Sequence, residues 1–281
     1  MKITGDYVLT PQGLVHKSRV HQVGVSSGTG TPGPKSGPPP SNSVMRSLSA
    51  NGWKASATFA ADVPLGKMSV EFTVPEPPGM DGAIIFLFAG AENAQMRMIL
   101  QPVLQWGDNG LPDLPDGWNI ACWYVSPVGH WYVSNPQPVC PGDTVTGTVQ
   151  VVQCSECSDQ SPDATCEWMI EASTPNVCTS LKNGQVLKDG DTVPLKLKSL
   201  MLFLIGAALE AYPSDPCCTG VRPEQYPASG STTFTDIELI DLAGDHFIAD
   251  WNPICADADM FCGCKNTVVI SPDQSTITLR Y

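Results

Sequence analysis

The sequence predicts an all-β protein, a β-sandwich or jelly roll with antiparallel sheets. About ten short apolar or alternating segments follow one another, and turn residues separate them. The 281 residues include 25 glycines and 26 prolines, too many for a helical bundle and without a collagen-like period. Because 42% of the residues are hydrophobic and only 15% are charged, most of the chain can fold around a sizeable core.

The expected strands are read from alternation and from the residues that end them. Residues 70–74 (Val-Glu-Phe-Thr-Val) alternate and stop at Pro75, and residues 84–88 are an apolar run between Gly82 and Gly90. Residues 200–210 could also form a helix, but the bracketing turn residues favour a buried strand. The other expected strands are 99–106, 118–125, 131–134, 144–152, 166–172, 199–212, 232–240, 267–270 and 276–279.

The chain is expected to divide into three parts. Residues 1–23 hold strand-like segments at 7–10 and 14–16, which either dock on the main domain or form a displaced pro-segment. Residues 24–43 are rich in Gly, Ser and Pro and cannot bury apolar surface, so they read as a linker or long loop. Residues 44–281 are expected to form a single β-sandwich domain.

Charge and hydropathy exclude several partners. Lys and Arg number 15 against 28 Asp and Glu, a net charge of −13, which argues against nucleic acid and anionic membranes as partners. The longest uncharged apolar run, 200–209, is far shorter than the roughly 20 residues that span a bilayer, so no membrane insertion is expected. The sequence does not predict an oligomeric state.

Eleven cysteines lie between Cys122 and Cys264. Such density in a loop-rich chain is typical of disulfides in an oxidising compartment, so an extracellular or cell-surface location is expected although no signal peptide is visible. The cysteine pairs 154/157, 217/218 and 262/264 leave a zinc site as the alternative. Disulfides are favoured over metal, and their connectivity cannot be read from the spacing.

Three polar residues stand out as candidates for chemistry. Gln101 and Gln105 are four residues apart on one expected strand, so their side chains share a face. Glu210 ends the most hydrophobic run of the chain, where burial would raise its pKa and suit it to proton transfer. The alternatives are a solvated face for Gln105 and an exposed, idle position for Glu210. No phosphate-binding loop, nucleophile elbow or His pair at helical spacing is present.

The order of several short motifs resembles the glutamic peptidases, the eqolisin family of acid endopeptidases. The resemblance spans about residues 80–281 and implies a jelly-roll sandwich of the concanavalin-like class. The motifs are Ile99-Leu100-Gln101, Trp123-Tyr124, the turn and strand 141–145, the stretch 168–174, Leu209-Glu210, the strand 233–235 and the closing Ser-Thr-Ile-Thr-Leu-Arg-Tyr.

The resemblance implies that Gln101 and Glu210 are a catalytic pair on the concave face. Glu210 would take a proton from a water lying between the two groups and later return it to the leaving nitrogen. The Gln101 amide would donate to the oxyanion. Such an endopeptidase needs no metal or cofactor, and its substrate is a polypeptide.

Two other functions stay open. The first is a glycan- or ligand-binding module, in which Gln105 and exposed aromatic residues line a groove. Those aromatic candidates are Trp118, Trp123, Tyr124, Trp131 and Tyr132, each of which could instead fill the core. The second is a structural surface or coat protein that uses the sandwich for durability.

Overall fold

The computed structural model describes residues 7–10, 13–16, 52–111, 113–155, 165–213, 221–255 and 266–281. In these ranges the chain is built from antiparallel strands, with one 3₁₀ turn at Pro223–Gln225 and no α-helix. None of them contains a helix long and apolar enough to cross a membrane. Strands β1 (Tyr7–Thr10) and β2 (Gly13–His16) pair only with each other, as a small separate sheet.

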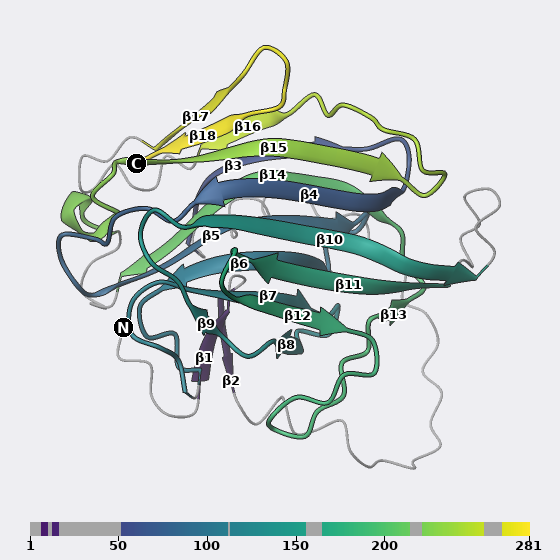
Figure 1. Cartoon of the computed structure of the whole chain (residues 1–281), viewed down its shortest axis with the longest axis horizontal. Coiled ribbons are helices and arrows are strands. Elements are labelled where there is room, and N and C mark those ends of the chain that lie inside the picture. The colour runs from purple at the N-terminus through teal and green to yellow at the C-terminus, as the bar shows by residue number, and fades with distance from the viewer. Residues whose placement is uncertain are drawn as a thin grey trace, which may run out of the picture.

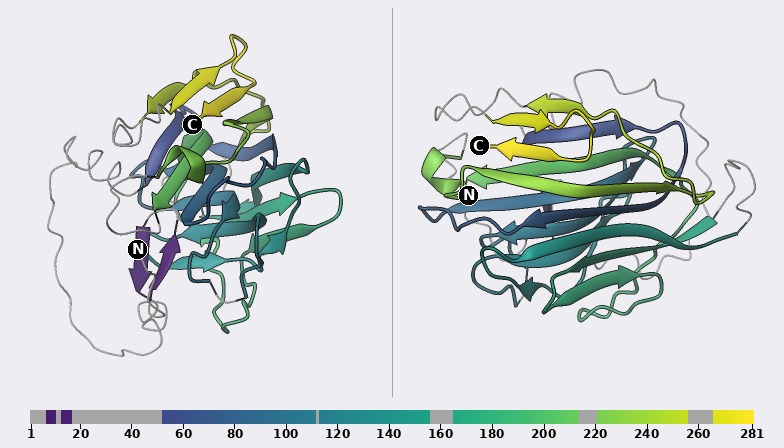
Figure 2. Two further views of the ribbon diagram at one scale, coloured as in Figure 1. Left: turned by 90° about the vertical axis from the view of Figure 1, so that its left-hand side faces the viewer. Right: turned by 45° about the horizontal axis from the view of Figure 1, so that its top comes forward.

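Two eight-stranded sheets form the sandwich (Figures 1 and 2). The front sheet in Figure 1 runs in the order β12-β11-β10-β4-β15-β18-β17, with β13 beside β11. Its strands are β4 (Leu65–Thr73), β10 (Thr144–Ser155), β11 (Thr165–Ser173), β12 (Cys178–Lys182), β13 (Lys196–Leu197), β15 (Ser231–Asp241), β17 (Thr267–Ile270) and β18 (Ile277–Arg280).

The back sheet runs in the order β16-β3-β14-β5-β6-β7-β8, with β9 beside β7. Its strands are β3 (Trp53–Ala60), β5 (Ala83–Asn93), β6 (Ile99–Trp106), β7 (Asn119–Val125), β8 (Trp131–Val133), β9 (Gln137–Pro138), β14 (Met201–Pro213) and β16 (Asn252–Cys255).

The main core lies between the two sheets and follows from alternation. On β11, Trp168 and Ile170 point inward while Glu167 and Glu171 are partly exposed. On β6 of the back sheet, Leu100 and Leu104 point into the same core. The front sheet therefore has one apolar face and one wet face, as in most antiparallel sandwiches.

The back sheet is apolar on both faces. A second cluster, here called the outer cluster, covers the face turned away from the front sheet. Because this face is also buried, β5 and β7 are buried along most of their length and read as continuous apolar runs. The outer cluster consists of Ile84, Phe86, Phe88, Ile99, Val103, Leu111, Ala121, Trp123, Val125, Trp131, Ile205 and Ala208, with Trp53, Leu114, Val133, Phe203 and Tyr212 packed against it.

The predicted all-β sandwich is confirmed, and so is the strand interpretation of residues 200–210, all but the first of which lie in β14. A disulfide joins Cys154 to Cys166 across β10 and β11, so Cys154 does not pair with Cys157 as a metal ligand. Among the described residues Cys122, Cys140, Cys178 and Cys255 are free thiols. The linker expected at 24–43 and the cysteines at 157, 217, 218, 262 and 264 lie outside the described residues.

Candidate functional site

The three polar candidates lie on the outer face of the back sheet. Gln101 and Gln105 alternate along β6 with Ile99 and Val103, which belong to the outer cluster. Glu210 follows Ala208 on the same face of β14. All three side chains are almost completely shielded from solvent, with 0%, 1% and 0% of their surface exposed for Gln101, Gln105 and Glu210. The expected exposed position for Glu210 and solvated face for Gln105 are therefore not observed.

Gln105 is held in a hydrogen-bond chain. Its side-chain amide donates to Asn119 Oδ1 at 2.7 Å, and its oxygen accepts from the Trp123 indole at 3.3 Å. Asn119 in turn donates to the carbonyl of Gly117 at 3.3 Å. Because its nitrogen and its oxygen both have partners inside the protein, Gln105 is fixed in one orientation.

Gln101 is in the opposite state. Neither its side-chain nitrogen nor its oxygen has a hydrogen-bond partner, although both atoms are buried. The residue facing it across the ladder is Gly90, and a Cβ placed there would lie 3.2 Å from Gln101 Cβ and 2.7 Å from the Leu100 carbonyl. A buried amide without partners costs free energy, so a native protein normally keeps one only where water or a ligand completes it.

Glu210 is a buried carboxyl with one unpartnered oxygen. The Tyr212 hydroxyl donates to its Oε2 at 3.3 Å, and its Oε1 has no partner. Burial raises the pKa of Glu210 well above its usual value; the Tyr212 hydrogen bond opposes that shift, and the negative charge of Glu92 adds to it. Burial and the neighbouring Glu210 likewise raise the pKa of Tyr212. The carboxyl therefore stays protonated into a higher pH range than an exposed glutamate.

Strand register puts Glu210 level with Gln105. Glu210 pairs with Phe86 on β5, and Phe86 pairs with Gln105 on β6. Gln101 lies four residues further along β6, which corresponds to about 13 Å of strand. The structure thus brings Gln101 and Glu210 to one face of one sheet, but their backbone positions are offset.

Glu92 is a further carboxyl on this face that the sequence analysis missed. It pairs with Ile99 on β6 and with Phe203 on β14, both of which contact the outer cluster. Its side chain is partly buried, and burial raises its pKa from 4.5 to about 7. The period of two on β5 was the available signal, since Phe86, Phe88, Gly90 and Glu92 must share a face.

The five aromatic candidates divide between the two faces of the back sheet. Trp123 and Trp131 lie in the outer cluster with ring centroids 5.9 Å apart. Tyr124 and Tyr132 stack on each other at 5.6 Å on the inner side, and Trp118 also packs in the inner core. Tyr124 and Tyr132 therefore do not line the face that carries Gln101. Trp123 is 0% exposed, so it offers no free ring face to a sugar.

A pocket of about 360 Å³ adjoins the outer cluster. The connection between β6 and β7 forms it, and Leu111 of that connection belongs both to the pocket lining and to the outer cluster. Three aspartates give the pocket a negative potential. They are Asp108, Asp113 and Asp116.

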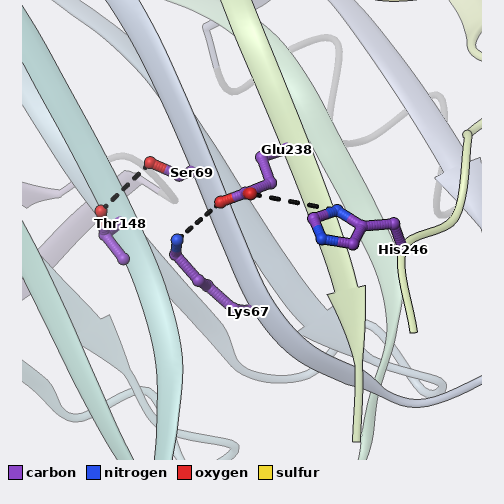
Figure 3. A network of polar contacts seen from close by, with 5 residues as sticks. All are labelled: Lys67, Ser69, Thr148, Glu238 and His246. Atoms are coloured by element: carbon purple, nitrogen blue, oxygen red, sulfur yellow. Dashed lines mark hydrogen bonds and ion pairs between the residues drawn. The ribbon is translucent and has the colours of Figure 1, made fainter. Parts of the chain in front are cut away.

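The front sheet carries a different polar network on its outer face (Figure 3). Lys67 pairs with Glu238 at 2.6 Å, His246 lies 3.9 Å from the same carboxyl, and Ser69 contacts Thr148 at 3.4 Å. The pKa of Glu238 is lowered, mainly by the Lys67 hydrogen bond. Lys67 and Glu238 are partly exposed and serve as hydrogen-bond partners to each other. We therefore interpret the network as a surface ion pair that contributes to stability and not as a functional site. Within the described ranges no group of three or more His, Cys, Asp or Glu is arranged to hold a metal ion.

Comparison with known proteins gives a resemblance at the level of the fold. No family model and no curated protein matches the sequence. The chain is similar to scytalido-glutamic peptidase solved with a peptide-based transition-state analogue, with a TM-score of 0.48 and 14% identity over 82% of this chain and 98% of that chain.

Two further solved structures belong to the same comparison. SCP-B, a member of the eqolisin family in complex with the tripeptide Ala-Ile-His, gives a TM-score of 0.47 and 14% identity over 82% of this chain and 98% of that chain. CG-16, a homodimeric agglutinin from chicken liver, gives a TM-score of 0.31 and 11% identity over 58% of this chain and 97% of that chain. With identities this low, an activity has to be argued from the side chains of the site.

Proposed function

We propose that the protein is an endopeptidase of the glutamic-peptidase kind, with its active site on the outer face of the back sheet. Gln101 would donate its amide N–H to the oxyanion that forms when water attacks the scissile carbonyl. Glu210 would transfer protons during the reaction. The observation that carries the proposal is the set of buried polar atoms without partners, both amide atoms of Gln101 and one oxygen of Glu210, on a single face.

The alternative functions have less support. Stacking on sugar rings needs exposed aromatic faces. Trp123, Tyr124 and Trp131 are buried, and the half-buried Tyr132 already stacks on Tyr124. A purely structural protein would gain nothing from an unpartnered amide and a buried carboxyl, because both cost stability. A polypeptide is therefore the substrate that we propose, and an extracellular location remains compatible with the one disulfide among the described residues.

The raised pKa values bear on the working pH. A carboxyl that accepts a proton from water must be ionised, so activity should increase as the pH rises through its pKa. Since burial raises the pKa of Glu210 well above its usual value, the ascending limb belongs at a higher pH than the acid range that the sequence resemblance implied.

The test is cleavage of denatured casein by the purified full-length chain between pH 3 and pH 8. Glu210→Gln keeps the size of the side chain but cannot transfer a proton, so we expect a loss of about 100-fold or more in rate. Glu238→Gln, on the far side of the sandwich, is the matched control and should keep the wild-type rate. Equal rates for wild type and Glu210→Gln would reject the proposal.

A further inference from the structure

Gln101 has a nearer carboxyl than Glu210 in the ladder. Gln101 faces Gly90 on β5, and Glu92 stands two residues beyond Gly90 on that same neighbouring strand. Such diagonal neighbours have Cα atoms about 7–8 Å apart, within the reach of long side chains. Glu210, by contrast, is two strands away and four residues along.

A water molecule between Gln101 and Glu92 would complete the Gln101 amide. Both polar atoms of that amide lack partners, and at Gly90 the backbone of β5 lies close to Gln101. Glu92 is only partly buried, whereas Gln101 and Glu210 are completely buried, so solvent can reach the site at the Glu92 end. The negative charge of Glu92 also raises the pKa of Glu210, which by register lies level with Phe86, six residues from Glu92 along β5.

We propose that Glu92 is a second catalytic carboxyl, which holds and deprotonates the attacking water together with Gln101, while Glu210 protonates the leaving nitrogen. This assignment rests on the proposed peptidase function. It gives the two carboxyls different roles according to their surroundings, since the more solvated one ionises first and the fully buried one keeps its proton.

The proton balance closes over one turnover. Glu92 as carboxylate takes a proton from water while the water oxygen forms a bond to the carbonyl carbon. The C–N bond then breaks, and the leaving nitrogen takes the proton of Glu210. The products are a carboxylic acid and an amine. A proton moves from Glu92 to Glu210 through solvent and restores the starting state. No co-reactant besides water is consumed.

The ionisable groups that can influence Glu92 are few. Strands β3, β14, β5 and β6 carry Lys54, Glu210, Tyr212 and Glu92 itself, and the turn after β5 carries the exposed Arg97. Because the charge of Glu92 raises the pKa of Glu210, we expect the two carboxyls to titrate as a coupled pair.

The first experiment compares pH–rate profiles of wild type, Glu92→Gln, Glu210→Gln and the control Glu238→Gln on denatured casein. We expect Glu92→Gln to lose about 100-fold or more in rate and to lose the ascending limb near pH 7. If Glu92→Gln keeps the wild-type rate and profile while Glu210→Gln is inactive, the peptidase function stands and the role of Glu92 is overturned.

A second readout does not depend on activity. The titration of Glu92 is followed by NMR of the full chain labelled with ¹³C at glutamate carboxyl carbons, assigned with Glu92→Gln. Gln101→Leu removes the amide that shares the water, so the pKa of Glu92 should rise; Gln105→Leu should leave it unchanged. If casein is not cleaved at any pH, the peptidase function fails, and an unshifted titration in Gln101→Leu would remove the Glu92–Gln101 pair as well.

Discussion

At the scale of single residues, Gln101 and Gln105 show that the same side chain on the same strand face can have opposite energetics. Gln105 has both ends satisfied by Asn119 and Trp123. Gln101, four residues away and equally buried, has neither end satisfied. The first arrangement stabilises the fold, and the second is tolerable only where function requires it.

Substitution by leucine should separate the two cases. Gln101→Leu removes a buried amide that has no partner within the protein, so we expect the free energy of unfolding to rise by about 1–2 kcal/mol even though the water that Gln101 is proposed to share with Glu92 is lost as well. The measurement is urea denaturation followed by tryptophan fluorescence. A loss of stability in Gln101→Leu would mean that the water proposed between Gln101 and Glu92 fully offsets the cost of burying the amide in the free protein.

Gln105→Leu is the counterpart and should behave in the opposite way. It leaves the Asn119 oxygen and the Trp123 indole without partners, so the free energy of unfolding should fall by about 1–3 kcal/mol. Equal effects of the two substitutions would contradict the hydrogen-bond chain described for Gln105.

At the scale of elements, the sequence predicted strands well where apolar residues alternate or run together. The expected segment 99–106 coincides with β6, and the expected 267–270 coincides with β17. Strand β3 was missed although it lies inside the back sheet, because three of its eight residues are Ala and one is Lys, which carry little β-propensity. Its position comes from pairing with β14 and β16, which no local pattern reveals.

The site was predictable to the level of its face. Period-two alternation grouped Gln101 with Gln105, and the apolar run before Glu210 correctly indicated a buried carboxyl. The level of Glu210 relative to the two glutamines depends on bulges in β14, which shift its register against β5 and β3. Such shifts arise from tertiary packing, so the offset from Gln101 and the place of Glu92 could not be derived from the sequence.

One prediction at this scale concerns the contact between the sheets. Gly147 on β10 faces Pro102 on β6, and an added Cβ would lie 2.7 Å from Pro102 Cγ and 3.1 Å from its Cβ. Because a proline ring cannot rotate away, Gly147→Ala should lower the free energy of unfolding by about 1–3 kcal/mol. Gly79→Ala is the control, because a Cβ at Gly79 would lie 3.7 Å from its nearest neighbour, the Glu224 carbonyl oxygen. Thermal unfolding of both variants tests the prediction, and equal stabilities would contradict it.

At the scale of the whole molecule, the back sheet departs from the usual sandwich because it buries both of its faces. The inner face forms the common core, and the outer cluster buries Gln101 and Glu210 among aromatic and aliphatic side chains. In such surroundings a protonated carboxyl carries no charge and is tolerated, whereas ionising it costs free energy. The chemistry proposed for this face and the stability of the fold are therefore linked through pH.

This linkage has a definite sign. Glu92 and Glu210 have higher pKa values in the folded protein than in the unfolded chain, so the folded state binds more protons between the two values. Their favourable contribution to the free energy of unfolding is complete below about pH 4.5. It is lost as the pH rises through the pKa values of the folded protein. For Glu92, a shift from 4.5 to about 7 corresponds to about 3 kcal/mol.

We therefore expect the free energy of unfolding to fall by at least about 3 kcal/mol between pH 4.5 and pH 8, with Glu210 adding to the loss from Glu92. Glu92→Gln cannot ionise, so its urea midpoint should change less over the same range and should exceed that of wild type at pH 8. Glu238→Gln should keep the wild-type slope, because the pKa of Glu238 is lowered and its effect belongs to acid pH. A wild-type stability that increases from pH 4.5 to pH 8 would mean that these carboxyls ionise without cost, and the buried two-carboxyl site would have to be abandoned.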